Sequence, residues 1–75
     1  MAKRRDPLLR ALGARVRQLR EGKGWTQESL ADRAGLDRSY IAGIEAGLRN
    51  PSIKALARIA KGLGVTVAEV VANAD

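Results

Sequence analysis

Cysteine, histidine and phenylalanine are all absent from this chain of 75 residues. Without cysteine there is no disulfide framework and no thiolate nucleophile, and without histidine there is no imidazole base, imidazole metal ligand or switch near neutral pH. One Trp and one Tyr are the only aromatic residues, so the core must be aliphatic. The eight carboxylates are scattered and form no pair with separate acid and base roles. We therefore expect no enzymatic activity, no metal and no cofactor.

The length limits the architecture to one domain, since single domains usually run to about 100 residues or more. We expect a basic N-terminal extension at residues 1–6, one domain at residues 7–75, and no small-molecule ligand, because a second, sensing module has no room. The chain has no apolar run long enough for a signal peptide or a membrane span. A cytoplasmic protein without a membrane partner is expected. So short a domain buries little apolar surface, which favours dimerisation.

Basic residues outnumber acidic ones, 14 to eight. The whole formal net charge of +6 lies in residues 1–25, because residues 26–75 carry equal numbers of each sign. Such an excess suits a polyanion, and nucleic acid is the first candidate, although charge runs are often only solvated faces. The segment Lys3-Arg4-Arg5 is either an arm in the minor groove or a tail without structure, with the tail slightly favoured.

Apolar spacing predicts five helices and no strand, which makes the fold all-α. The first helix starts at Pro7, and its apolar stripe consists of Leu8, Leu12, Val16 and Leu19. The expected N-caps of the later helices are Thr26, Asp37, Ser52 and Thr66, the last in a capping box with Glu69. Glycines end the helices, at positions Gly22 and Gly24, Gly35, Gly47 and Gly64.

The segment from Gln27 to Ala46 carries the most informative pattern. Its two short helices are joined across Ala34-Gly35-Leu36, so the chain must reverse within about three residues, and Gly35 supplies the positive φ that such a turn requires. On a helical wheel the second of these helices turns Ile41 and Ile44 toward the core, with Leu36 and Leu48 at its ends. Its other face carries Arg38, Ser39, Ala42, Gly43 and Ala46.

This outer face indicates DNA binding. A face exposed only to water would be expected to carry Glu, Lys and Gln, whereas Gly43 costs roughly 1 kcal/mol relative to Ala. Small side chains allow close approach, and a helix with Arg38 and Ser39 at its N-terminal end fits the major groove, where Arg38 can donate two hydrogen bonds to guanine. The residues expected to read bases are Arg38, Ser39, Tyr40, Ala42 and Gly43.

Two of these residues have alternative roles. Arg38 can form a surface salt bridge with Asp37 or Glu45, and Tyr40 can pack at the edge of the core or contact a phosphate. Phosphate contacts should flank the reading helix, because neutralising the backbone supplies most of the affinity and helix N-termini offer N–H donors. The candidates are Thr26, Gln27, Arg49, Asn50, Ser52 and Lys54. Of these, Thr26 and Ser52 also serve as caps, and Arg49 can touch either backbone or adjacent bases.

The pattern Thr26-Gln27-x-x-Leu30-Ala31-x-x-x-Gly35-Leu36-x-x-x-x-Ile41-x-x-Ile44-Glu45-x-Gly47-x-x-x-Pro51-Ser52 resembles the Cro-like and phage-repressor helix-turn-helix family over residues 8–72. Within it, Leu36-Asp37-Arg38-Ser39-Tyr40-Ile41, Gly43-Ile44-Glu45, Arg49-Asn50 and Lys61-Gly62-Leu63 resemble the controller proteins of restriction-modification systems. The resemblance implies a compact five-helix repressor-like fold. It also implies a homodimeric transcriptional regulator that binds a palindromic operator in double-stranded DNA and controls its own promoter and a neighbouring endonuclease gene.

The resemblance further implies a structural ion pair between Arg20 and Glu45, and the helical wheels agree, since each residue borders its own apolar stripe. It places base reading on Arg38, Ser39 and Tyr40 and phosphate binding on Gln27 and Ser52. The candidate dimer interface is the last helix, with Val65, Val67, Val70 and Val71, although these valines can instead close the core. RNA polymerase is a further candidate partner.

Two other classes of function fit parts of the sequence. An antitoxin-like helix-turn-helix module could serve mainly to dock another protein, but the basic excess and the bare outer face argue against that as its only role. Residues 8–20 have an apolar stripe beside arginines, as membrane-surface helices do. That stripe is better explained as the core on which the other helices pack.

Overall fold

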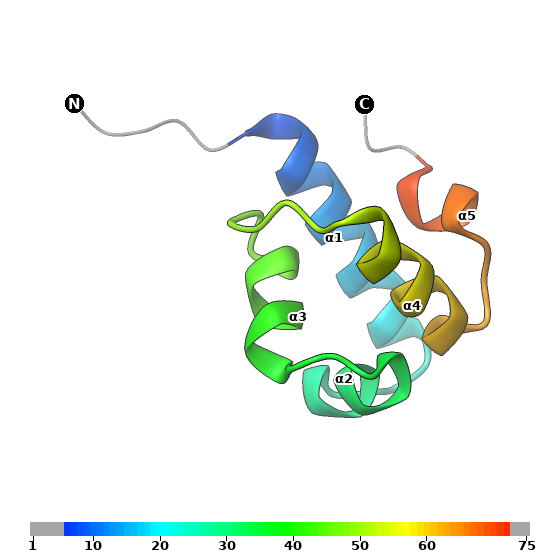
Figure 1. The fold of residues 1–75 in the computed structure, drawn as a ribbon. Helices are drawn as coiled ribbons and strands as arrows, with labels where there is room; N and C mark the ends of the chain where they lie inside the picture. Colours follow the sequence, from blue (N-terminus) through cyan, green and yellow to red (C-terminus); the bar gives the residue numbers. More distant parts are fainter. Residues whose placement is uncertain (1–5, 73–75) are drawn as a thin grey trace.

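The computed structural model describes residues 6–72, which form five helices and no strand. The helices are α1 (Pro7–Gly22), α2 (Gln27–Ala34), α3 (Arg38–Glu45), α4 (Ile53–Leu63) and α5 (Val67–Val71). α3 packs against α1 and α2, α4 packs on α2, and α5 covers α1 and α4 on the side away from α3 (Figure 1). The predicted all-α fold is confirmed.

Side-chain caps explain where most helices begin. Asp6, Thr26, Ser52 and Thr66 each accept a hydrogen bond from a backbone N–H in the first turn of the helix that follows. In the capping box of α5, the Glu69 carboxylate accepts the Thr66 backbone N–H at 2.9 Å. This hydrogen bond from Thr66 holds the pKa of Glu69 below its usual value.

The cap predicted for α3 is wrong in one respect. Asp37 occupies the N-cap position, but its side chain makes no capping hydrogen bond. The first turn is closed by the backbone instead, since the N–H groups of Tyr40 and Ile41 donate to the Asp37 carbonyl at 3.1 and 3.2 Å. The start of α3 is therefore not capped by the Asp37 side chain.

The turn between α2 and α3 has the predicted glycine pivot. Gly35 has φ 68°, and the Leu36 N–H donates to the Ala31 carbonyl at 2.9 Å, which is the pattern of a helix ended by a left-handed residue. Ala31 is buried, so its small side chain lets α2 pack closely in the core. This short turn fixes α3 beside α2.

The core is aliphatic, as the composition predicts. Its fully buried large side chains are Val16, Leu30, Ile41, Ile44, Ile59, Leu63 and Val70, while Trp25, Leu36 and Tyr40 pack at its margin. Leu48 was expected at the core end of α3 but is 64% exposed, because it follows Gly47, whose positive φ of 74° turns the chain away from the core. The close approach of α1 to α3 depends on Gly13, whose Cα faces the Ile44 and Glu45 carbonyls.

Candidate nucleic-acid interface

On the outer face of α3, Arg38 and Ser39 are exposed at the N-terminal end, and Ala42 and Gly43 beyond them are half-exposed. Arg38 forms no ion pair with any residue between 6 and 72, so the expected alternative of a salt bridge with Asp37 or Glu45 is wrong. The carboxylate of Glu45 is already bound by other side chains. The guanidinium of Arg38 is therefore free to bind a ligand beside α3.

Tyr40 adopts the packing role that was its alternative. Its ring is half-buried against the core, and its hydroxyl oxygen accepts the backbone N–H of Ser52 at 3.4 Å. The guanidinium of Arg49 lies over the same ring, 5.3 Å from its centroid. Tyr40 thus connects α3 to the start of α4 by a hydrogen bond, and its ring contacts the guanidinium of Arg49.

The phosphate candidates lie at the starts of α2 and α4 and in the loop between α3 and α4. The Thr26 and Ser52 hydroxyl oxygens accept the Ser29 and Ala55 N–H groups at 3.1 and 3.0 Å, which leaves each hydroxyl proton to be donated elsewhere. Arg49, Asn50 and Lys54 are exposed. These helix starts and loop residues supply donors on both sides of α3.

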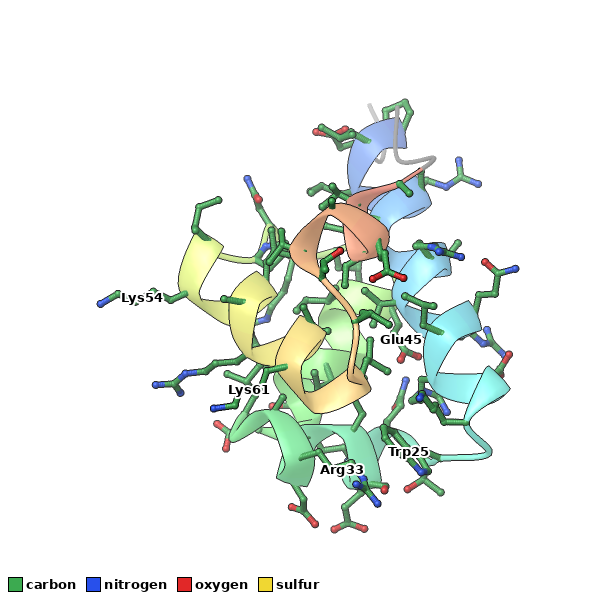
Figure 2. All side chains as sticks on the ribbon, turned by 90° about the vertical axis from the view of Figure 1, so that its right-hand side faces the viewer. Trp25, Arg33, Glu45, Lys54 and Lys61 are labelled. Carbon is green, nitrogen blue, oxygen red and sulfur yellow. The ribbon has the colours of Figure 1, made fainter. Side chains whose placement is uncertain are left out.

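A buried ion pair holds α3 to α1, as the resemblance implies. Arg20 binds Glu45 with both ends of its guanidinium, Nε to Oε2 at 2.7 Å and Nη2 to Oε1 at 2.9 Å, and Nη1 donates to the Trp25 carbonyl at 2.7 Å. The side chains are only 11% and 3% exposed. Figure 2 shows Glu45 inside the fold. The hydrogen bond with Glu45 keeps the pKa of Arg20 above its usual value.

Gln27 joins this ion pair. Its Nε2 donates to Glu45 Oε1 at 3.1 Å, so the residue expected at a phosphate is also anchored inside the molecule. The same carboxylate therefore fixes the end of α1, the start of α2 and the end of α3 relative to one another. This network orients both α3 and Gln27, a flanking phosphate candidate.

The loop before α2 is held by a residue pair that the sequence reasoning missed. The Arg33 guanidinium lies 3.9 Å from the centroid of the Trp25 ring, and Lys23 Nζ lies 5.8 Å from it (Figure 2). The single Trp of the sequence, placed just before the N-cap Thr26, is the signal that could have found this stack. It fixes the loop that leads to a candidate phosphate contact.

A row of basic side chains lies on α4, and only its first member, Lys54, was expected from the sequence. Lys54, Arg58 and Lys61 lie on its exposed face and pair with no carboxylate among residues 6–72, and Figure 2 shows Lys54 and Lys61 projecting on the same side. Arg58 Nη1 donates to the Gly35 carbonyl at 3.4 Å. The signal in the sequence is an eleven-residue helix with no acidic residue, whose like charges at spacings of three and four repel one another.

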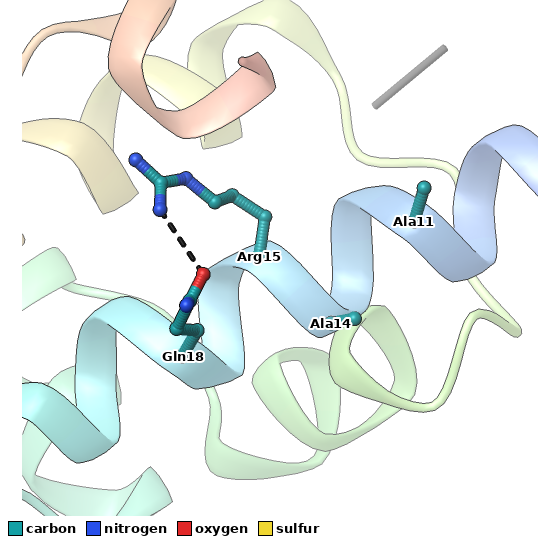
Figure 3. Close-up of a pocket in the computed structure, with 4 residues that line it drawn as sticks. All are labelled: Ala11, Ala14, Arg15 and Gln18. Atoms are coloured by element: carbon teal, nitrogen blue, oxygen red, sulfur yellow. Dashed lines mark hydrogen bonds between the residues drawn. The ribbon is translucent and has the colours of Figure 1, made fainter. Parts of the chain in front are cut away.

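The basic side chains of α1 are more engaged. Arg17 pairs with Glu21 at 3.0 Å, and Arg15 donates to Gln18 at 3.1 Å beside a shallow hollow lined by Ala11 and Ala14 (Figure 3). Lys3, Arg4 and Arg5, which carry part of the expected N-terminal excess, lie outside the described residues. The exposed positive charge of the described residues therefore includes the row on α4, although the whole formal net charge is carried by residues 1–25.

The four valines proposed for the dimer interface occupy different environments. Val70 is fully buried in the core, so its assignment to an interface is wrong: it packs inside the protomer, where α5 meets α1 and α4. Val65 is partly buried against the same core. Val67 and Val71 are 37% and 39% exposed and remain surface candidates.

Residues 6–72 contain neither a metal-binding cluster nor a membrane-spanning helix. No group of three or more acidic, Cys or His side chains there could hold a metal ion. Nor is any of the described helices long and apolar enough to cross a membrane.

Known proteins that are similar to this chain have the same helix-turn-helix arrangement. Residues 16–70 match the family model described as helix-turn-helix. The crystal structure of the restriction-modification controller protein C.AhdI from Aeromonas hydrophila is 44% identical, superposes with a TM-score of 0.81, and is matched over 83% of this chain and 94% of that protein. Control protein C.MunI from Mycoplasma sp is 39% identical, and the match covers 84% of this chain and 86% of the length of C.MunI.

A phage protein is also similar. The immunity repressor of Bacillus phage phi105 is 40% identical over 80% of this chain, which spans only 42% of the repressor. The chain therefore belongs to the helix-turn-helix family and is a transcriptional regulator, and regulators of this family bind double-stranded DNA. Within the family it is similar to the restriction-modification controller proteins.

Proposed function

We propose that the chain is a homodimeric regulator of the restriction-modification controller type, which binds a palindromic operator at its own promoter in the cytoplasm. The observation that carries this proposal is the exposed Arg38 at the start of α3, which pairs with no carboxylate among residues 6–72, on a helix held in place by the buried Arg20–Glu45 pair. The similarity to C.AhdI over 94% of that protein supports the controller assignment. In this proposal residues 7–75 form the DNA-binding and dimerisation domain.

On this proposal α3 enters the major groove with its N-terminal end first. Arg38 donates two hydrogen bonds to O6 and N7 of a guanine, and Ser39 donates or accepts at a neighbouring base. The small side chain of Ala42 lets the helix approach the bases closely. Thr26, Gln27, Asn50, Ser52 and Lys54 contact phosphates on either side, and the basic row on α4 adds attraction to the duplex.

Dimerisation makes the operator a palindrome. In a symmetric pair the two α3 helices must lie about 34 to 36 Å apart to enter successive major grooves on one face of the duplex. Val67 and Val71, both partly exposed on α5, are the proposed interface. The concentration of the chain then sets occupancy of the operator, and RNA polymerase is a further proposed partner at the promoter.

Selection of bound sequences from random duplex DNA at near-physiological salt tests the proposal. We expect a palindromic sequence that binds about 10³-fold or more tightly than a scrambled duplex, the usual range for specific regulators. Association that depends on salt but selects no motif would contradict sequence-specific regulation. It would favour the protein-docking module, since the net charge alone would then drive DNA association.

Arg38→Ala should cost roughly 1 to 3 kcal/mol of operator binding and relax the preference at one base position. Lys54→Ala is the matched control, because this exposed side chain makes no hydrogen bond or ion pair within residues 6–72. It should weaken all duplexes about equally and reduce the slope of log K against log salt by about 1. Titrations with operator and scrambled duplex measure both effects. Equal losses on the two duplexes for Arg38→Ala would rule out base reading.

A further inference from the structure

The side chain of Arg49 lies across α3 at Gly43. A Cβ built on Gly43 would stand 2.8 Å from Arg49 Cγ, 3.1 Å from Cδ and 3.3 Å from Nε. The stem of Arg49 thus fills the space that any other residue at position 43 would need. Its guanidinium continues over the Tyr40 ring, 5.3 Å from the centroid. The backbones of the two residues are also in contact, because the N–H of Arg49 donates to the Gly43 carbonyl at 3.2 Å.

The helix itself does not require glycine at this position. Gly43 lies inside α3 and is not among the glycines with positive φ, whereas Gly35 and Gly47 at the ends of helices are. Glycine within a helix lowers its stability relative to alanine. Two explanations remain for a residue without a side chain here: close approach of DNA to the helix, or the space that Arg49 occupies.

We propose that Gly43 and Tyr40 form a seat that fixes Arg49 on the outer face of α3. Gly43 provides the space for the stem of Arg49, and the ring of Tyr40 supports the guanidinium. Arg49 is then presented to DNA as part of the reading helix rather than as a mobile loop residue. Because a long side chain loses rotamer freedom on binding, holding it in place beforehand improves affinity. Gly43 is a positioning residue in this arrangement. The inference rests on the proposed DNA-binding function.

A double-mutant cycle tests the seat. Operator affinity is measured at fixed salt for the full chain and for Gly43→Ala, Arg49→Ala and the double variant. Thermal unfolding is recorded for each. Gly22→Ala is the matched control: Gly22 is also helical and also replaced by alanine, but a Cβ there meets nothing within 4 Å. It should leave operator affinity unchanged.

Arg49→Ala should weaken operator binding on the order of tenfold, the effect of losing one charged DNA contact. Gly43→Ala should weaken it by several-fold, because the new methyl group displaces the stem of Arg49, while Tm stays equal to or above that of the wild type. With Arg49 already removed, Gly43→Ala should change affinity by less than about twofold. A loss of affinity without a loss of stability is an effect that a merely structural glycine would not produce.

Other outcomes would overturn the seat. If the fold-losses of operator affinity for the two single variants multiply in the double variant, Gly43 serves close approach of DNA independently of Arg49. An unchanged affinity for Gly43→Ala would mean that the position of Arg49 on α3 does not matter for binding. Both results leave the proposed function intact, because the wild type still prefers its operator. If the wild type itself prefers no sequence, the proposed function fails before the cycle is reached.

Discussion

Glu45→Ala should lower the free energy of unfolding by about 3 to 5 kcal/mol, because removing one partner of a buried ion pair leaves most of the other charge uncompensated. Arg20 is 11% exposed and would lose two of its three hydrogen bonds, keeping the one to the Trp25 carbonyl and a longer contact of 4.0 Å with the Glu21 carboxylate. Gln27 would lose its contact as well. Domains are stable by about 5 to 15 kcal/mol in total, so a chain this small should be close to unfolded. Urea denaturation monitored by circular dichroism measures the change.

Arg17→Ala is the control for this prediction. Arg17 and Glu21 form an ion pair of similar length, 3.0 Å, but both side chains are more than half exposed. Exposed pairs contribute about 0 to 1 kcal/mol, so this variant should unfold close to the wild type. If Glu45→Ala were no more harmful than Arg17→Ala, the Arg20–Glu45 pair would not be the contact that holds α3 to α1.

The helices could be predicted because their limits are set locally. A cap such as Ser52 acts within three residues, and a positive-φ glycine such as Gly35 acts within one turn, so both are visible in the order of residues. The error at the side chain of Asp37 arose where the backbone closed the first turn of α3 by itself. Spacing alone does not distinguish these two ways of starting a helix.

Contacts between distant segments could be predicted less well. The Arg20–Glu45 pair was expected only because the motif resembles a known family. The burial of Val70 depends on how α5 docks on α1 and α4, which the period of α5 does not determine. The stack of Arg33 on Trp25 and the passage of Arg49 over Gly43 depend on the direction of long side chains in three dimensions. The sequence therefore indicated that Gly43 leaves space on the outer face of α3, but not that Arg49 fills this space.

Gly13→Ala should destabilise the fold by about 3 kcal/mol or more, at or above the upper end of the usual cost of overpacking. A Cβ at Gly13 would stand 2.2 Å from the Ile44 carbonyl oxygen and 2.7 Å from that of Glu45. Both atoms are backbone, so no side chain can rotate away and α1 and α3 must separate. That movement would also strain the Arg20–Glu45 pair at the end of α3, and operator affinity should fall with stability.

Thermal unfolding measures this effect, since 1 kcal/mol shifts Tm by about 4 to 8 °C in a domain of 60–100 residues. Gly13→Ala should therefore lower Tm by about 12 °C or more. Gly22→Ala lies in the same helix with open space around its Cβ and should leave Tm unchanged or raise it. Because a Cβ meets the backbone of α3 at Gly13 and nothing at Gly22, equal Tm values for the two variants would mean that α1 and α3 are not packed this closely, and the support of α3 would have to lie elsewhere.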